Sequence, residues 1–138
     1  MGYQSRRPED LQKSRVIDFC QALAGRNLER VFSLMTDSAT LSWGPYGFND
    51  RKAIIRWAGE LYELFPFMSI QSKSLNVNGP TVRQELVIAF LTSEKQRGWL
   101  PCVAEYGFEK GRICSLSITL LNGYLAVNRS DVVGIRAS

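Results

Sequence analysis

Hydrophobic residues in this chain follow a helical period in its first half and an extended period after Pro66. The helical spacing is clearest in RKAIIRWAGELYELF, where apolar positions lie alternately three residues and one residue apart. Pro8 suits the start of the first helix, Gly25 its end, and Asn27 the cap of a second. Asn49 or Asp50 caps a third, which Pro66 ends. The pattern therefore predicts three helices, at 8–24, 27–35 and 51–65.

Extended patterns account for most of the remaining chain. The segment ATLSW, residues 39–43, predicts a strand between the second and third helices, and the Gly/Pro loop GPYGFND follows it. Four further strands are predicted after Pro66, at 67–77, 81–93, 99–109 and 112–122, with a tight turn at Lys110-Gly111 before the last. The continuous apolar run from Leu86 to Leu91 is typical of a strand covered on both faces.

The order of these elements indicates the fold class. Helices followed by a run of strands are typical of an α+β domain, with the helices gathered on one side of a mostly antiparallel sheet. A chain of 138 residues, 45% of them hydrophobic, is long enough for one domain with its own core. We therefore expect a single domain over 1–138, with a loose lead-in at 1–7, a core over about 10–122 and a C-terminal tail at 123–138.

The absence of histidine from the chain limits its chemistry. It excludes relays built on Ser–His or Cys–His and every metal site with a His ligand. Cys20, Cys102 and Cys114 show no metal-like pairing and have no imidazole to activate them, so we expect reduced, buried thiols. We predict neither a metal nor a cofactor, and any acid or base must be Asp, Glu, Tyr, Lys or Cys.

Charge and hydropathy bear on partners and location. The net charge of +4 comes from scattered Lys and Arg residues, with no basic stripe interleaved with aromatics, so we expect no nucleic-acid partner. No apolar run approaches the length of about 18 residues that spans a membrane. Because the start MGYQSRRPEDLQKS has no apolar segment of the signal-peptide kind, we expect a cytoplasmic protein.

Residues 19–43 resemble a known superfamily. The stretch DFCQALAGRNLERVFSLMTDSATLSW is similar to the pattern ALNAGDLDALxALxADDAxxxD of the nuclear transport factor 2-like superfamily, which includes the SnoaL-like and ketosteroid isomerase families. Gly111-Arg112-Ile113 matches the GKI before its last strand, and the resemblance covers about residues 10–122. It implies a cone-shaped, curved, mostly antiparallel sheet wrapped around three N-terminal helices (nuclear transport factor 2-like, or cystatin-like). It also implies a pocket inside the cone and a homodimer through the outer sheet face.

The resemblance also locates the positions of the catalytic groups in relatives. Ketosteroid isomerase uses a carboxylate base, a tyrosine and a protonated aspartate. These positions fall on Trp43, Phe19 and Ala104. SnoaL-like cyclases carry a His and an Asp in the last strand, at positions that fall on Leu116 and Ile118. None of these five residues can transfer a proton, so the resemblance implies that the usual acid–base set is missing.

Alternation in the last strand supports the same orientation. It puts Cys114, Leu116, Ile118 and Leu120 on the inner face and Ser115, Ser117 and Thr119 on the outer face. We therefore predict an apolar pocket without catalytic residues, with tyrosines as candidate polar anchors. Its predicted lining is Phe19, Trp43, Tyr46, Trp57, Tyr62, Ala104, Tyr106, Leu116, Ile118 and Leu120.

Three functions stay open on the sequence alone, and with them the question of whether the protein is an enzyme. The first is binding of a small hydrophobic molecule in the cone. A packed cone without a cavity of about 300 Å³ would argue against this function. The second is an isomerase, cyclase or hydrolase using relocated Glu and Tyr groups, with Glu85 the first candidate and Glu60 and Glu105 after it. The third is a protein-interaction or dimerisation module that uses the outer sheet face.

Overall fold

The computed structural model describes residues 8–91 and 94–121, which form the α+β arrangement predicted from the order of the elements. The elements are, in chain order, α1 (Pro8–Ala24), α2 (Leu28–Ser33), β1 (Met35–Trp43), β2 (Tyr46–Phe48), α3 (Arg51–Leu64), β3 (Ser69–Asn78), β4 (Thr81–Leu91), β5 (Arg97–Glu109) and β6 (Arg112–Leu120). The predicted helices and the predicted run of four strands are thus all present.

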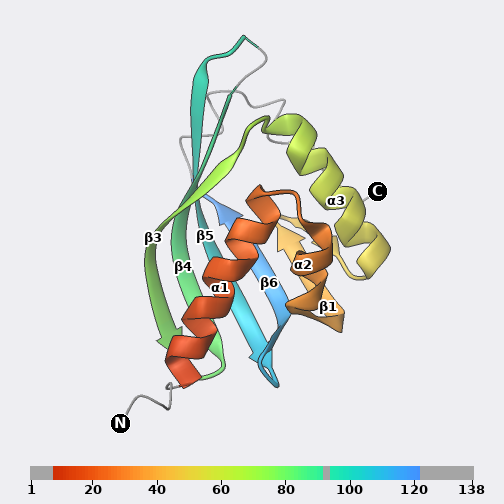
Figure 1. The fold of residues 1–138 in the computed structure, drawn as a ribbon, viewed down its shortest axis with the longest axis vertical. Helices are drawn as coiled ribbons and strands as arrows, with labels where there is room; N and C mark the ends of the chain where they lie inside the picture. The colour runs from red at the N-terminus through yellow and green to blue at the C-terminus, as the bar shows by residue number, and fades with distance from the viewer. Residues whose placement is uncertain (1–7, 92–93, 122–138) are drawn as a thin grey trace.

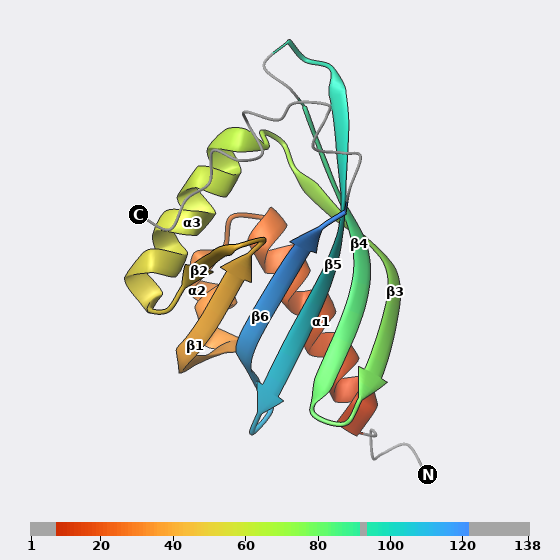
Figure 2. The ribbon, with the colours of Figure 1, turned by 180° about the vertical axis from the view of Figure 1, so that it is seen from behind.

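All six strands belong to one sheet, in the order β2-β1-β6-β5-β4-β3. The β1–β6 pair is parallel and the other pairs are antiparallel, so the sheet is mostly antiparallel, as expected. Figures 1 and 2 show the sheet curving around α1, which lies across its concave side, with α2 and α3 on that same side. The sheet therefore forms the wall of the cone, and the helices pack against its concave side.

Side-chain caps fix the helix ends in the last two helices. Asn27 Oδ1 accepts the Arg30 amide at 3.1 Å, and Asp50 Oδ1 accepts the Ala53 amide at 2.8 Å. The inner face of α3 follows the predicted spacing and buries Ile54, Trp57, Ala58 and Leu61. Helix packing against the sheet is therefore set by the same periodicity that the sequence displays.

The first strand is longer than predicted, and the loop after it is partly a strand. β1 begins at Met35, which pairs with Ile113 of β6, so the predicted turn TDSA is extended backbone. Tyr46 pairs with Trp43 across a tight hairpin in which Gly44 has a φ of 58°. Because Gly44 tolerates this left-handed conformation, β1 folds back as β2 instead of entering an open loop.

Bulges change the face of residues in two strands. A register shift at Lys73 turns Leu75 toward the core, opposite Gln84. The alternation of inward and outward side chains in β3 therefore changes at the bulge. A second shift lies between Ile113, which is fully buried, and Ser115. Cys114 is half-buried. Gly107 of β5 lies on the outer face of the sheet, and a Cβ built on it would lie 3.6 Å from the Cys114 sulfur. The Cys114 side chain therefore points to the outer face, and its predicted inward orientation is wrong.

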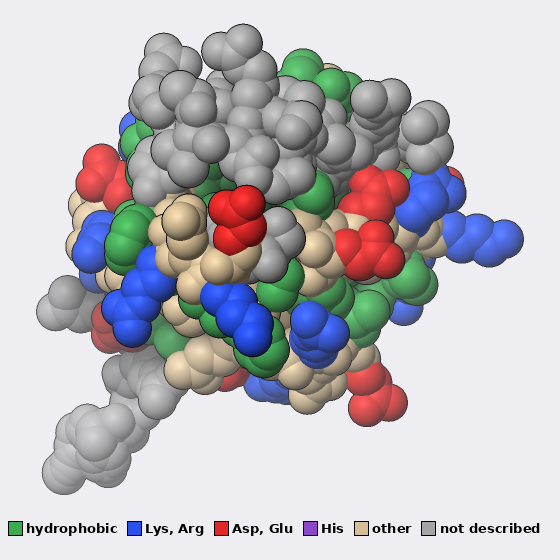
Figure 3. Space-filling model, turned by 90° about the horizontal axis from the view of Figure 1, so that it is seen from above, with side chains coloured by type: hydrophobic (Ala, Val, Ile, Leu, Met, Phe, Trp, Pro, Cys, Tyr) green, Lys and Arg blue, Asp and Glu red, His purple; other side chains and the backbone are tan. Residues whose placement is uncertain are grey.

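The outer surface carries scattered charges. Figure 3 shows acidic and basic side chains interspersed on the face seen from above. Three ion pairs among the described residues join exposed side chains: Arg30 to Asp18 at 2.8 Å, Arg51 to Asp37 at 3.3 Å and Arg83 to Glu105 at 3.6 Å. Within the described ranges, no helix combines the length and the apolar character needed to cross a membrane.

Candidate functional site

The concave side of the sheet and the helices enclose one small cavity in the core. Its volume is about 20 Å³, and its wall is apolar. The lining consists of Phe19, Cys20, Leu23, Trp43, Trp57, Leu61, Ile70, Leu86, Ile88, Ala104, Tyr106, Leu116 and Ile118. This space is about that of one water molecule, and an apolar hole of this kind stays dry.

Most of the predicted lining residues surround this cavity, and three do not. Phe19, Trp43, Trp57, Ala104, Tyr106, Leu116 and Ile118 line it. Tyr46, half-buried in β2, and Leu120, half-buried near the end of β6, lie outside its lining. Tyr62 is half-buried on α3, where its hydroxyl donates to the Leu23 carbonyl at 2.6 Å and the Arg26 guanidinium lies 4.9 Å from its ring centre.

Aromatic side chains fill the space that a ligand would need. The ring centres of Trp43 and Trp57 are 6.0 Å apart, and those of Trp43 and Phe65 are 6.4 Å apart. Phe19 meets Tyr106 edge-on at 6.0 Å. Such packing is favourable beyond the area it buries. Since small-molecule sites typically offer 300 Å³ or more, the interior as it stands is a packed core.

A polar cluster of three neutral groups lies within this apolar core. The Tyr106 hydroxyl donates to Gln84 Oε1 at 2.7 Å, and Cys20 Sγ lies 3.5 Å from that hydroxyl and 3.6 Å from Gln84 Nε2. Gln84 is fully buried and is the one buried polar residue in the described part of the chain. The cluster satisfies the amide and the phenol inside a medium where an unpaired polar group is costly.

Burial keeps the titratable members of this cluster uncharged. Loss of solvent raises the pKa of Tyr106 well above its ordinary value, and the neighbouring Cys20 raises it further. Burial also raises the pKa of Cys20, against the opposing effect of its hydrogen bonds to Tyr106 and Gln84. Because an amide such as Gln84 does not titrate, the cluster has no group suited to general acid–base catalysis at neutral pH.

The carboxylates proposed as relocated acids lie elsewhere. Glu85 is exposed on the outer face of β4, so it is not the inward-facing acid that a relocated acid–base pair would need. Glu105 is exposed on the outer face of β5, beside Arg83. Glu60 is partly exposed on α3. In residues 8–91 and 94–121, no Asp or Glu is buried, so the cone lacks a carboxylate there.

Gln84, next to Glu85 in the chain, is a buried polar residue that was not among the predicted site residues. Strand parity is the signal that identifies it, because Val82, Gln84, Leu86 and Ile88 share one face of β4 and all are buried. A glutamine among alternating apolar residues is the pattern of a buried, hydrogen-bonded amide.

Two indole groups in the core lack a hydrogen-bond acceptor. The Nε1 atoms of Trp43 and Trp57 are buried and have no partner among the described residues. Leaving such a donor unpaired costs about 1–3 kcal/mol. These two donors are therefore the features of the core that its own packing does not satisfy.

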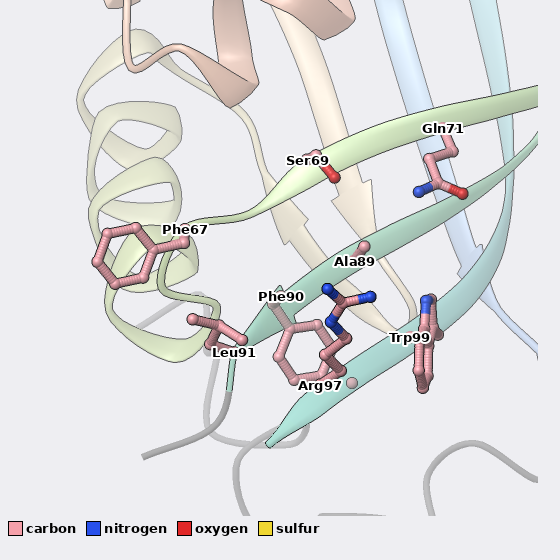
Figure 4. A pocket seen from close by; sticks show the side chains of 9 residues that line it. Phe67, Ser69, Gln71, Ala89, Phe90, Leu91, Arg97 and Trp99 are labelled. Atoms are coloured by element: carbon pink, nitrogen blue, oxygen red, sulfur yellow. The ribbon is translucent and has the colours of Figure 1, made fainter. Parts of the chain in front are cut away.

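An open crevice of about 350 Å³ lies at the end of the sheet where β3, β4 and β5 meet. Figure 4 shows Arg97 and Trp99 of β5 beside Ala89 of β4, with Phe67 at the far end. Phe67 is 82% exposed and has a φ of 55°, a conformation that bulky residues rarely adopt, and Trp99 is 46% exposed. Large apolar side chains are thus presented to solvent on this side of the sheet.

No group of three or more His, Cys, Asp or Glu side chains that could hold a metal ion occurs within the described residues.

Comparison with known proteins defines the fold. No protein-family model matches the chain, and no curated protein does either. A putative SnoaL-like polyketide cyclase from Jannaschia sp. CCS1 superposes with a TM-score of 0.79 at 17% identity, over 94% of this chain and 96% of that one. IdmH, a putative polyketide cyclase from Streptomyces antibioticus, gives 0.74 at 14% identity, over 90% and 99%.

A de novo designed protein with a curved β-sheet also superposes, with a TM-score of 0.67 at 15% identity, over 92% of this chain and 97% of that one. At such identities the likeness concerns the backbone, and the same backbone carries different functions. The curved sheet, the helices on its concave side and these superpositions together show that the chain has the nuclear transport factor 2-like fold, in the form seen in SnoaL-like proteins.

Proposed function

We propose that this chain is a non-catalytic interaction module that pairs with a second copy of itself through the outer face of β4 and β5. The observation that carries the proposal is an apolar patch on that face, which we call the outer patch. It consists of Val87, Ala89, Leu91, Trp99, Pro101 and Val103, each half-buried or exposed. The packed interior supports the proposal because it contains neither the space nor the carboxylates of an acid–base site.

The outer patch has the form of a sheet-packing surface. Val87 lies opposite Pro101 and Ala89 opposite Trp99 in the β4–β5 pairing, so the apolar side chains stand in adjacent rows. Two sheets that pack face to face lie about 10 Å apart and interdigitate such rows. Ser117 and Thr119 of β6 continue the same face as a polar margin.

The charges at the two ends of the outer patch favour a second copy as the partner. Glu85 precedes Val87 at one end, and Arg97 precedes Trp99 at the other. Neither makes an ion pair with another residue in the described ranges. A two-fold axis that lies in the interface and runs perpendicular to the strands reverses the strand direction between the two copies. Glu85 of each copy then lies next to Arg97 of the other, which gives two symmetric contacts. Like charges would meet if the axis ran along the strands.

Sedimentation analysis across a concentration series tests this arrangement. We expect a concentration-dependent dimer that Trp99→Ser weakens. Glu85→Arg and Arg97→Glu should each weaken it about tenfold, which corresponds to about 0.7 kcal/mol at each of the two symmetric contacts. The double charge exchange should restore most of the affinity. A wild type that stays monomeric at millimolar concentration would overturn the proposal, and charge variants without effect would overturn the axis.

The unpaired indole donors favour a second candidate function, the binding of a small apolar molecule with one acceptor oxygen. Trp43 and Trp57 line the cavity, and their indole N–H groups have no acceptor among the described residues, so a carbonyl ligand that widened the cavity would satisfy them. The three tryptophans give three indole N–H signals in NMR spectra. Titration with cyclohexanone should then move the signals of Trp43 and Trp57 and leave that of the exposed Trp99 in place. Equal movement of all three, or none, would count against this function.

A further inference from the structure

A groove on the helical side of the molecule gathers arginines from three separate elements. It lies where α1, α2 and the start of β6 meet and has a volume of about 380 Å³. Its polar lining consists of Ser14, Arg15, Asp18, Arg30, Ser33 and Arg112. The groove shares no residue with the outer patch, which lies on the opposite face of the sheet.

The groove carries more positive charge than its own carboxylate neutralises. Arg30 Nη2 contacts Asp18 Oδ2 at 2.8 Å, which balances one guanidinium. Arg112 Nη2 donates to the Met35 carbonyl, a neutral acceptor, so its charge is not balanced by that bond. Arg15 forms no ion pair with any residue in 8–91 or 94–121. Three guanidinium groups therefore share one carboxylate.

Contacts with the backbone and with Asp18 hold two of the three guanidinium groups in place, those of Arg112 and Arg30. The Met35 carbonyl, at the start of β1, fixes the head of Arg112. Arg15 lies against the β5–β6 turn, with Nη2 3.8 Å from the position that a Cβ of Gly111 would occupy. Gly111 has a φ of 80°, so a larger residue there would be strained. At Arg30 and Arg112 a ligand would thus meet donors that are already held by contacts, which lowers the entropic cost of binding.

We infer that this groove binds the phosphate group of a small phosphorylated molecule. Guanidinium groups present planar pairs of N–H donors that match phosphate oxygens, and a dianion balances the two charges left over. The hydroxyls of Ser14 and Ser33 line the same wall. The volume fits a small molecule rather than an extended polyanion, for which a continuous basic track would be needed.

NMR titration of the labelled protein with inorganic phosphate and with glycerol phosphate, at constant ionic strength, tests the inference. We expect saturable shifts of the backbone amides of Ser14, Ser33 and Arg112, with a dissociation constant on the order of 1 mM. Arg15→Gln should weaken binding at least fivefold. Asp18→Asn should tighten it severalfold, because it frees Arg30 for the ligand. Arg83→Gln, on the outer sheet face, is the matched control and should leave binding unchanged.

The two ligands separate the sources of the phosphate. Tighter binding of glycerol phosphate would indicate that the groove also accepts the organic part, and equal binding would indicate recognition of the phosphate group alone. Shifts that grow linearly without saturation would overturn the inference. The same loss of binding in Arg83→Gln as in Arg15→Gln would also overturn it, since it would show a general charge effect. The spectra of each variant report in the same experiment whether it is folded.

Discussion

The two faces of the β4–β5 pair both carry apolar side chains, but their surroundings differ. On the inner face, Leu86, Ile88 and Leu100 are buried beneath the helices. On the outer face, Val87 and Ala89 are only half-buried, and Trp99 is 46% exposed. The apolar run over 86–91 predicted cover on both sides, and in the described chain only the concave side receives it. The inner face therefore stabilises the fold, and the outer face is available for contact with another molecule.

The same contrast applies to polar groups. Inside the cone, Gln84 and Tyr106 satisfy one another and stay neutral. Outside it, Glu85 and Arg97 are charged and have no ion-pair partner among the described residues. Chemistry that needs charge is therefore confined to the surface of this domain.

The largest expected effect comes from exchanging one tryptophan on each side. Trp57→Ala removes a buried side chain that packs on Trp43 and Phe48, and should lower the free energy of unfolding by about 3–5 kcal/mol. Trp99→Ala on the outer face should change it by less than about 1 kcal/mol in dilute, monomeric protein. Urea unfolding followed by circular dichroism measures both. Similar losses for the two variants would remove the distinction between the faces.

Alkaline pH should destabilise the inner side in particular. Burial raises the pKa of the Cys102 thiol from 9.0 to about 12. Between these values the unfolded chain releases a proton that the folded chain retains, so the free energy of unfolding should fall by about 1.4 kcal/mol per pH unit. Below pH 9 the Cys102 contribution is constant. Tyr106 acts in the same direction above its ordinary pKa of 10.0.

Thermal melts between pH 7 and pH 11 measure this loss. Cys102→Val keeps the side chain apolar and cannot titrate, so the decline of this variant should be shallower. A wild type whose melting temperature stays level to pH 11 would show that these groups are not buried as described.

The smallest effect concerns the hydrogen bond inside the cone. Tyr106→Phe removes the donor to Gln84 Oε1 and leaves that oxygen with only the weak thiol of Cys20, which should cost about 1–3 kcal/mol. The double variant Tyr106→Phe/Gln84→Met replaces both partners by apolar groups, so its loss should be smaller than the sum of the single losses. Strictly additive losses in chemical denaturation would mean that the two side chains are not coupled.

Much of the fold could be predicted because it rests on local periodicity. The spacing of Ile54, Trp57 and Leu61 identified the buried face of α3, and the change of period after Pro66 identified the run of strands. The pocket-lining positions Phe19, Trp43 and Ala104 followed from the resemblance and lie around the cavity. The predictions that were wrong concern residues at bulges and hairpins. A one-residue shift near Cys114 reverses a side chain, and sequence alternation cannot register it.

The sequence by itself determined the order of the elements and the lack of histidine, because these are properties of residue identity and spacing. Only the tertiary structure decided how much space the core side chains leave, that Gln84 rather than Glu85 faces inward, and that Arg15, Arg30 and Arg112 meet in one groove. The physical reason is that cavity volume, strand register and the meeting of charges depend on segments distant in the chain. No local pattern contains those distances.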